Sequence, residues 1–207
     1  MPVRRLNHRL FRSFFRKKVA EVAVNLIGQR LVRVIHGRRL AGIIVETEAY
    51  LGIPDQAAHT FNGRHTKRNH SMWMDGGHAY IYSIYGMHHC LNMVAGCEGE
   101  PVAVLLRAIE PTEGLDRMRK LRGQAARQET DLCSGPAKLC QALDVDRRFD
   151  GIDTTQNSSL WVERIRARPY VGSKIIATTR VGVDYAGPWA HKLLRFYLVN
   201  NPHISCR

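Results

Sequence analysis

Apolar residues in the first fifty positions follow two spacings, and each spacing predicts one kind of element. Over residues 19–27 they recur three and four positions apart, which is the pattern of an amphipathic helix. Ser13 is a candidate N-cap for this helix, and Gly28 is a candidate stop signal. Residues 30–36 and 40–48 have the composition of two strands joined by a short turn. We therefore expect a helix followed by a β-hairpin.

The middle and end of the chain predict further strands with short helices between them. Alternating side chains over residues 79–94, with a turn near Gly86, predict a second hairpin, and residues 102–109 form a continuous apolar run typical of a buried strand. Thr112 is a candidate cap for one short helix, and Ser134-Gly135-Pro136 is the start of another. Late strands are expected over residues 174–183 and 193–199.

The chain shows no internal repeat and no low-complexity linker, so we expect one mixed α/β (α+β) domain. Residues 1–13 are predicted to be a basic N-terminal arm, and residues 14–207 the domain itself. Residues 51–77 form a polar loop that is too long for a plain connector, and ordered loops of this length usually carry function. Residues 122–130 are the best candidate for a mobile loop.

The distribution of charge changes the picture of what this domain contacts. Lys and Arg number 31 against 18 Asp and Glu, which gives a net charge of +13. The first forty residues hold a single acidic residue, Glu21, among many basic ones. Such a field favours a polyanion and points to nucleic acid, with a membrane surface or a basic surface kept for solubility as alternatives. No run of eighteen apolar residues is present, so no membrane-spanning segment is expected.

Cysteine usage predicts a reducing, cytosol-like compartment, because five cysteines are an odd count in a chain that can build an ordinary core. The N-terminus lacks the apolar stretch of a secretory signal, although its Arg-rich composition leaves an organellar transit peptide as an alternative. A metal site at His88-His89-Cys90 and Cys97 is a further alternative. The cysteine spacing is wider than that of structural zinc sites, so no metal is expected.

One strand carries candidate acid–base chemistry. Period-two geometry places Glu46, Glu48 and Tyr50 on one face, at the end of an apolar strand. These carboxylates either form ordinary salt bridges with the many arginines or include a group that orients or deprotonates water. The commonest signatures of nucleotide binding, of α/β-hydrolases and of zinc proteases are not present.

Tyrosines gather near the same elements, since Tyr50, Tyr80, Tyr82 and Tyr85 are four of the seven in the chain. Tyrosine is common in half-buried strands, so packing alone is one explanation. The functional explanation is a stacking surface, because flat aromatic rings bind a planar base and bind a cationic base better.

Five stretches, in this order along the chain, carry a resemblance to a known family. They are VETEAYLGIPDQAAHTFNGRHTKRN (45–69), YIYSIYGMHHCLN (80–92), LLRAIEP (105–111), LCSGPAKLCQAL (132–143) and RVGVDYAGPWAHKLLRFY (180–197). Together they resemble the 3-methyladenine (alkyladenine) DNA glycosylase family over roughly residues 14–200. Each motif alone is weakly specific, and the five in sequence order are highly specific.

The resemblance implies a fold and a reaction. The fold is a curved antiparallel sheet or open barrel with surrounding helices and a protruding β-hairpin, similar to the C-terminal domain of methionyl-tRNA formyltransferase. The reaction is hydrolysis of the N-glycosidic bond of a purine flipped out of double-stranded DNA, which leaves an abasic site. Relatives act on 3-methyladenine, 7-methylguanine, hypoxanthine and ethenoadenine. A monofunctional, monomeric bacterial cytosolic enzyme associated with the nucleoid is expected, with no cofactor and no membrane partner.

The resemblance also implies roles for pocket residues. Glu48 corresponds to the general base that activates water, and Arg107 to the arginine that helps to hold it. Tyr50 and Tyr82 correspond to rings on either side of the flipped base. The remaining pocket positions are His59, which completes the pocket, Tyr80, which holds the His59 side chain, and Asn92, which crowds the exocyclic amino group of normal guanine.

DNA contacts are expected outside the pocket. Tyr85 corresponds to a wedge left in the duplex where the base was, and inserted side chains of this kind offset the cost of unstacking. The other expected contacts are Met87, Arg64, Thr66, Lys67, Arg68, Ser134 and Gly135. His88 departs from the aromatic residue that relatives often carry. Two alternatives from other classes are a non-catalytic damaged-DNA-binding protein and an RNA-processing enzyme on the same scaffold.

Overall fold

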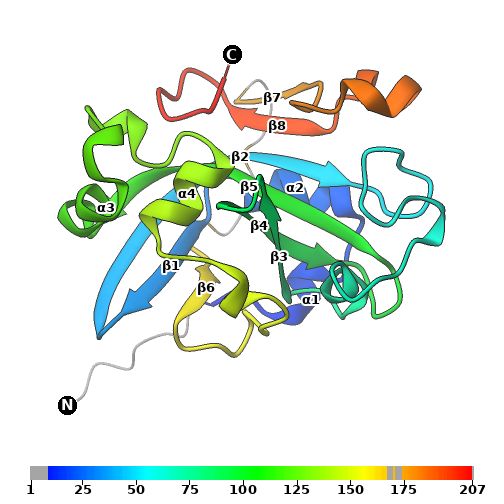
Figure 1. The fold of residues 1–207 in the computed structure, drawn as a ribbon, viewed down its shortest axis with the longest axis horizontal. Coiled ribbons are helices and arrows are strands. Elements are labelled where there is room, and N and C mark those ends of the chain that lie inside the picture. The colour runs from blue at the N-terminus through cyan, green and yellow to red at the C-terminus, as the bar shows by residue number, and fades with distance from the viewer. Residues whose placement is uncertain (1–8, 167–169, 171–173, 207) are drawn as a thin grey trace.

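A computed structural model describes residues 9–166, 170 and 174–206, and its centre is one antiparallel sheet (Figure 1). Its strands pair in the order β3-β4-β5-β2-β1-β6, and β2 also pairs with β8, which pairs with β7. The strands are β1 (Arg30–Ile35), β2 (Arg38–Tyr50), β3 (Ala79–Ile84), β4 (His88–Ala95), β5 (Val102–Glu113), β6 (Leu160–Glu163), β7 (Ile175–Thr178) and β8 (Arg195–Leu198). The sheet is antiparallel and is not closed. Together with the helices of the domain, it confirms the predicted α+β class.

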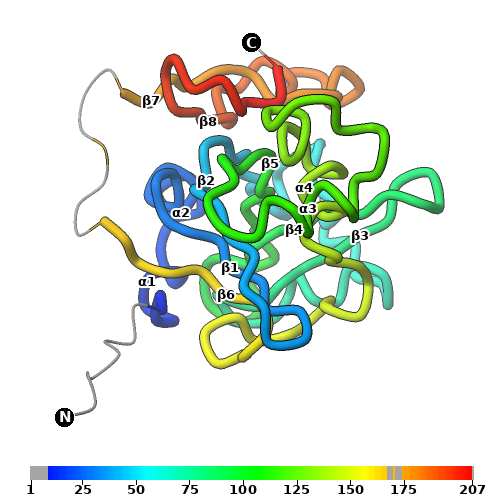
Figure 2. Tube along the Cα trace, turned by 90° about the vertical axis from the view of Figure 1, so that its left-hand side faces the viewer, coloured from blue at the N-terminus to red at the C-terminus, as the bar shows by residue number. Residues whose placement is uncertain are grey.

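Helices cover both faces of this sheet. Helix α2 packs on β2 and β5, whereas α4 packs on β4 and β5 with α3 beside it. Figure 2 shows α2 on one side of the sheet and the α3–α4 pair on the other. The α-helices are α1 (Arg12–Phe15), α2 (Val19–Leu26), α3 (Leu115–Arg122) and α4 (Pro136–Ala142). Short 3-10 turns are η1 (Phe61–Gly63), η2 (His70–Trp73), η3 (Gly123–Ala125), η4 (Glu129–Asp131), η5 (Arg147–Phe149) and η6 (Asp184–His191).

The β2–β5 pair forms the centre of the core and contains irregularities that matter for the site. Its register shifts on both sides of Glu46, where Glu46 pairs with Ala108 and the next residue, Thr47, pairs with Leu106. Arg107 therefore has no Cα partner on β2. A bulge of this kind bends the strand and redirects a side chain, and here it directs Arg107 toward the β2 carboxylates.

The first predicted hairpin is confirmed, whereas the limits predicted for the helix before it are wrong. Strands β1 and β2 meet at a two-residue turn in which His36 and Gly37 both have positive φ, as such turns require. No helix is capped by Ser13. The segment forms two helices, because Arg12 of α1 binds Asp153 and the Gly76 carbonyl, which fixes α1 apart from α2.

Further along the chain, the second hairpin and the start of α4 are confirmed. The strand predicted for 102–109 continues to Glu113, so Thr112 lies inside β5 and Gly114, with φ of 77°, occupies the N-cap position of α3. The strand predicted for 174–183 is shorter, and the predicted mobile loop contains η3 and η4.

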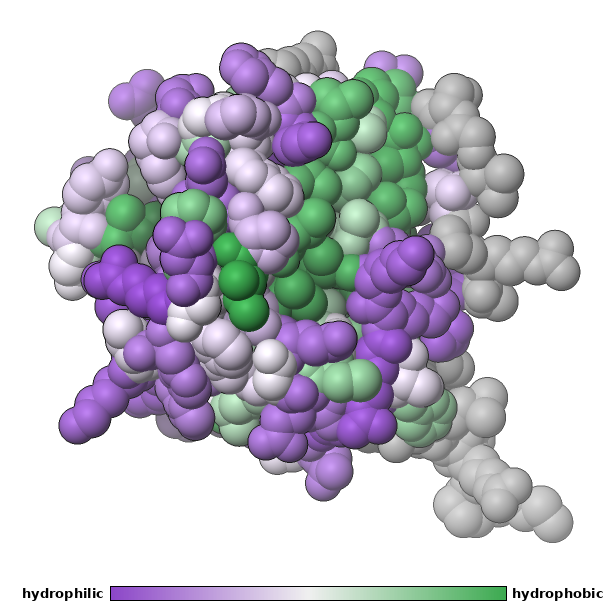
Figure 3. All heavy atoms as spheres, turned by 90° about the vertical axis from the view of Figure 1, so that its right-hand side faces the viewer, coloured by the Kyte–Doolittle hydropathy of each residue, from purple (hydrophilic) through white to green (hydrophobic). Residues whose placement is uncertain are grey.

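Part of the predicted N-terminal arm, residues 1–8, lies outside the described residues. Leu10 is buried, and its backbone N–H donates to Val162 of β6, so the end of the arm packs on the domain. None of the described helices combines the length and the apolar composition needed to cross a membrane. The side of the molecule that carries residues 51–77 is mostly hydrophilic, and its largest hydrophobic area lies above the centre of the view in Figure 3.

Candidate active site and DNA interface

A cavity of about 390 Å³ opens where β2, the β3–β4 hairpin, β5 and the segment after residue 180 converge. Aromatic and apolar side chains form most of its wall, and a few polar groups point into it, which is the usual character of a small-molecule site. The lining includes Tyr50, His59, Tyr80, Tyr82, Tyr85, Asn92, Arg107, Pro136, Val181 and Tyr185.

Glu48 lies behind this wall and is completely buried. Its Oε1 accepts a hydrogen bond from the Val181 backbone N–H at 2.8 Å and lies 3.2 Å from Arg107 Nη1. Its Oε2 accepts a hydrogen bond from the Tyr50 hydroxyl at 2.9 Å. An ionised carboxylate offers about four acceptor positions. The two hydrogen bonds and the Arg107 contact occupy three of them and leave one position on Oε2.

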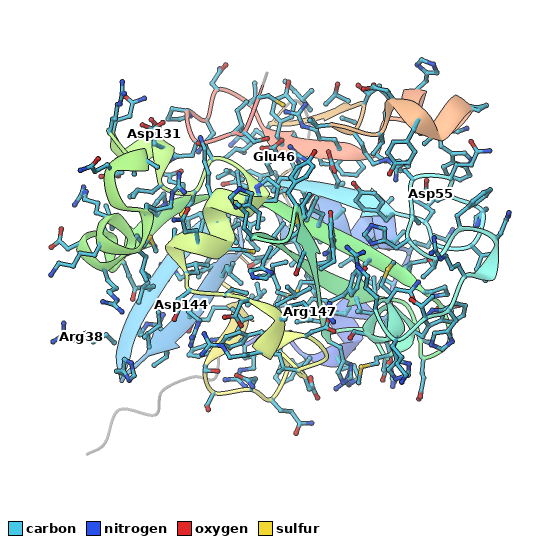
Figure 4. All side chains as sticks on the ribbon, viewed as in Figure 1. Arg38, Glu46, Asp55, Asp131, Asp144 and Arg147 are labelled. Carbon is cyan, nitrogen blue, oxygen red and sulfur yellow. The ribbon has the colours of Figure 1, made fainter. Side chains whose placement is uncertain are left out.

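Arg107 joins this carboxylate to a second one. Its Nε lies 3.1 Å from Oε1 of Glu46, the neighbour of Glu48 on the same face of β2. Burial acts to lower the pKa of Arg107, but the charges of Glu48 and Glu46 outweigh burial and raise it. Glu46 also lies 2.7 Å from Arg195 Nε, where β2 runs alongside β8 (Figure 4). One of the two candidate carboxylates, Glu46, is thus shared by two guanidiniums.

A second buried pair fixes Tyr50. Arg180 binds Asp55 through two nitrogens, at 2.6 and 2.9 Å, and both side chains are completely buried. The Arg180 guanidinium lies 4.7 Å from the centre of the Tyr50 ring. Asp55, on the loop after β2 (Figure 4), also accepts the backbone N–H of Ala57. Burial is the main cause that raises the pKa of Tyr50, and the charge of Glu48 adds to it.

His59, Tyr80 and Tyr82 form an aromatic part of the cavity wall. The Tyr80 hydroxyl lies 2.7 Å from His59 Nδ1, and the His59 and Tyr82 rings meet edge to face with centres 4.5 Å apart. Burial of the ring, followed by the positive charges of Arg68 and Arg64, lowers the pKa of His59. The histidine is therefore held neutral near pH 7.

Asn92 stands at the base of the same wall and is nearly completely buried. Its amide Nδ2 donates to the backbone carbonyl of Tyr80 at 3.0 Å and approaches that of Cys90 at 3.4 Å. Burial raises the pKa of the neighbouring Cys90 thiol to about 11. The contacts of Asn92 Nδ2 with the two backbone carbonyls set the orientation of the Asn92 amide.

The tip of the β3–β4 hairpin stands out from the body of the protein (Figure 2). Tyr85 is 89% exposed and Met87 is 72% exposed. Tyr85 also has a φ of 52°, in the left-handed region that non-glycine residues avoid. The hairpin therefore presents two large apolar side chains to solvent next to the cavity mouth.

The expected phosphate contacts occupy two places. Arg64, Thr66 and Arg68 line a second cavity of about 350 Å³ that shares His59, Tyr80 and Tyr185 with the first, and Lys67 is exposed on the same loop. Ser134 is half-buried and accepts a hydrogen bond from Lys138, and Gly135 precedes Pro136 at the wall of the first cavity.

Several residues that build the site were not assigned any role from the sequence. Asn69 donates to the carbonyls of His59 and Arg64 and accepts from Thr66, so it shapes the loop that carries them. Asp55, Asn69, Arg180, Val181 and Arg195 all lie inside the family-like stretches, which was the available signal. In the part of the chain that the structure describes, no three His, Cys, Asp or Glu side chains cluster as metal ligands.

Comparison of the chain with known proteins identifies its family. The sequence pattern of the family described as "Methylpurine-DNA glycosylase (MPG)" matches residues 13–202. The chain is 46% identical over 205 residues to the human protein named DNA-3-methyladenine glycosylase, with 95% of this chain and 68% of that protein covered. It is 43% identical over 205 residues to the mouse protein of the same name, with 95% and 61% covered.

Another relative matches over nearly all of its length. The protein of Methanocella arvoryzae, which bears the name 3-methyladenine DNA glycosylase provisionally, is 46% identical over 196 residues, with 95% of both chains covered. The resemblance read from the five motifs is therefore confirmed, whereas the likeness to the formyltransferase domain stays a prediction. The chain belongs to the methylpurine-DNA glycosylase family.

Proposed function

We propose that this protein is a monofunctional, monomeric DNA glycosylase that removes alkylated or deaminated purines from double-stranded DNA. The observation that carries the proposal is the buried Glu48 carboxylate, held by Arg107, Val181 and Tyr50 directly behind an aromatic cavity. The family membership supports the same activity. A purine inside a stacked duplex cannot reach such a cavity, so the nucleotide must flip out, at a cost of a few kcal/mol.

The cavity suits a flipped purine. Tyr50 and Tyr82 line it, and their rings bind a planar base by stacking, with extra attraction for a base that alkylation has made cationic. His59, held neutral, adds hydrogen-bonding capacity without a repelling charge. Asn92, fixed by the hairpin backbone, supplies the rigid side chain that would crowd the amino group of normal guanine.

Glu48 carries the chemistry. A water bound at its free acceptor position attacks C1′ of the deoxyribose, the C1′–N bond breaks, and its electron pair leaves with the purine. The water proton passes to Glu48, and the negative charge of Glu48 also stabilises the oxocarbenium-like transition state. Arg107, whose Nη1 lies 3.2 Å from Oε1, places a positive charge beside this carboxylate and helps to fix its position.

The hairpin tip and the basic loop hold the DNA. Tyr85 enters the space that the flipped nucleotide leaves, and Met87 lies beside it in the minor groove. Arg64, Thr66, Lys67 and Arg68 contact phosphates on one side, and Ser134 and Gly135 do so next to Pro136. With about six phosphates contacted, affinity falls on the order of a thousandfold or more between about 50 and 200 mM salt.

The test is to incubate alkylated duplex DNA with the protein and identify the bases set free. We expect free methylpurines and an intact sugar–phosphate strand, and the Glu48→Gln variant should release them roughly a hundredfold to ten-thousandfold more slowly. Binding of the lesion duplex should survive in this variant. Tight lesion binding without base release by the natural protein would support the non-catalytic alternative instead. Sedimentation in solution tests the monomeric state.

A further inference from the structure

The segment after β8 returns to the active site. Asn201 donates from Nδ2 to Oε2 of Glu110 at 2.7 Å, and the backbone N–H of Ser205 donates to Oε2 of Glu46 at 2.6 Å. Arg195 binds the backbone carbonyl of Cys206. Three contacts therefore hold this segment against the sheet, and its last part lies beyond residue 202, where the match to the family pattern stops.

The hydroxyl group of Ser205 contacts both members of the Arg107–Glu46 pair. Its Oγ is 3.1 Å from Nη2 of Arg107 and 2.9 Å from Oε1 of Glu46. A guanidinium has donors and no acceptor, and an ionised carboxylate only accepts. The hydroxyl must therefore accept from Arg107 and donate its one proton to Glu46, so its orientation is determined by its neighbours.

These contacts engage all three nitrogens of Arg107. Nε lies 3.1 Å from Glu46 Oε1 and 3.4 Å from Ser205 Oγ, while Nη2 lies 3.1 Å from Ser205 Oγ. Nη1, on the other side of the guanidinium, lies 3.2 Å from Glu48 Oε1. Because the guanidinium is planar and rigid, fixing two of its nitrogens fixes the direction of the third. Without the Ser205 hydroxyl group as a partner for Nη2, the Arg107 guanidinium could rotate about its Cδ–Nε bond while Nε stays close to Glu46.

We propose that Ser205 is a positioning residue of the active site, which sets the rotation of the Arg107 guanidinium so that Nη1 faces Glu48. The inference rests on the proposed glycosylase function, because its consequence is the placement of the water-activating carboxylate. Ser205 does not contact the base or the water, and it acts through Arg107. The segment after β8 is thus part of the catalytic architecture as well as of the fold.

The test compares Ser205→Ala with Ser205→Thr. Alanine keeps the backbone N–H bond to Glu46, so the segment remains docked, and removes only the hydroxyl group. Threonine restores a hydroxyl group at the same atom position. Cys206→Ala is the matched control, because its exposed side chain changes while the carbonyl that Arg195 binds remains.

Single-turnover rates of base release are measured together with lesion-duplex Kd and thermal unfolding. We expect Ser205→Ala to release base about tenfold more slowly, as loss of one hydrogen bond to a charged group predicts, with Kd within about twofold of the natural protein. Ser205→Thr and Cys206→Ala should match the natural protein. In an Arg107→Lys background, which lacks the planar fork, Ser205→Ala should have no further effect.

Two results would overturn the inference while the proposed function stands. One is an active protein in which Ser205→Ala releases base at the natural rate. The other is an equal loss in Ser205→Ala and Ser205→Thr that follows a lowered unfolding temperature, which would make the segment merely structural. If the natural protein itself releases no base from alkylated DNA, the proposed function fails, and this outcome is distinct from both.

Discussion

The hydroxyl group of Tyr50 donates a 2.9 Å hydrogen bond to Oε2 of Glu48, two residues earlier on the same strand. One side chain therefore has two roles, because its ring lines the cavity and its oxygen holds the carboxylate. Residues i and i+2 of a strand share a face, so the β2 backbone itself sets this contact. The stacking surface and the water-activating group are thereby mechanically linked.

Replacing Tyr50 by Phe separates these two roles. The ring remains, so lesion binding should stay within about threefold, while loss of a hydrogen bond to a charged group should slow base release by about tenfold. Single-turnover kinetics and binding titrations with the same lesion duplex measure the two quantities. A parallel loss of binding and rate would show that the hydroxyl serves stacking rather than Glu48.

Asn92→Ser tests the filter against normal guanine. Serine is shorter and loses the bond that fixes the amide on the Tyr80 carbonyl, so the pocket gains room for an exocyclic amino group. We expect release of undamaged guanine to rise and unfolding stability to fall by about 1 kcal/mol. The assay follows guanine release from unmodified duplex over hours. Unchanged selectivity would remove Asn92 from this role.

Tyr85→Ser tests the wedge. Because Tyr85 is 89% exposed and has a strained φ, its replacement should leave stability within about 0.5 kcal/mol. Affinity for a lesion duplex should fall more than affinity for undamaged DNA, since only the flipped state needs the gap filled. Competition binding with the two duplexes gives the ratio, and uniform weakening would argue for general DNA contact. Met87→Ala, on the same tip, shows whether the effect is specific to the ring.

The Arg180–Asp55 pair predicts a large stability effect. Arg180→Met leaves the completely buried Asp55 carboxylate without its partner, which should cost about 3–5 kcal/mol. Adding Asp55→Leu removes the stranded charge, so the double variant should be more stable than the single one. Urea unfolding measures both. Equal stability of the single and double variants would mean that solvent reaches the carboxylate.

His59 predicts a pH dependence of stability. Its pKa is lower in the folded protein than in the unfolded chain, so the unfolded chain takes up the proton first as the pH falls. Stability should therefore decrease below about pH 6.5, until the folded protein also binds the proton. Unfolding at about pH 7 and pH 5 should show a smaller loss for His59→Gln than for the natural protein. An identical loss would place the titration on other groups.

The sequence predicted which local elements form better than it predicted where each element begins and ends. The β1–β2 and β3–β4 hairpins follow from alternation and from turn residues, which are local signals. The end of β5 was wrong because its pairing with β2 holds Thr112 in the sheet, and pairing between distant strands leaves no local pattern. The helix at Ser13 was wrong for the same reason, since Arg12 is fixed by Asp153.

The residues of the site also divide into those that the sequence revealed and those that only the structure shows. Glu48 and Tyr50 share a strand face that period-two spacing reveals, and the family resemblance supplied Arg107 and the hairpin tyrosines. Arg180 and Ser205 contact Asp55 and Glu46 from more than one hundred residues away in sequence, so no spacing rule connects them to the site. Only the folded chain shows that they meet there.

Among the residues that the structure describes, three buried carboxylates and three buried guanidiniums meet around the cavity. The carboxylates are Glu46, Glu48 and Asp55, and the guanidiniums are Arg107, Arg180 and Arg195. Loss of any one leaves a buried charge without its partner, which is costly in the low-dielectric interior. Evolutionary drift here must proceed by coordinated exchange, and an alignment of relatives should show Asp55 and Arg180 changing together, as a covarying pair.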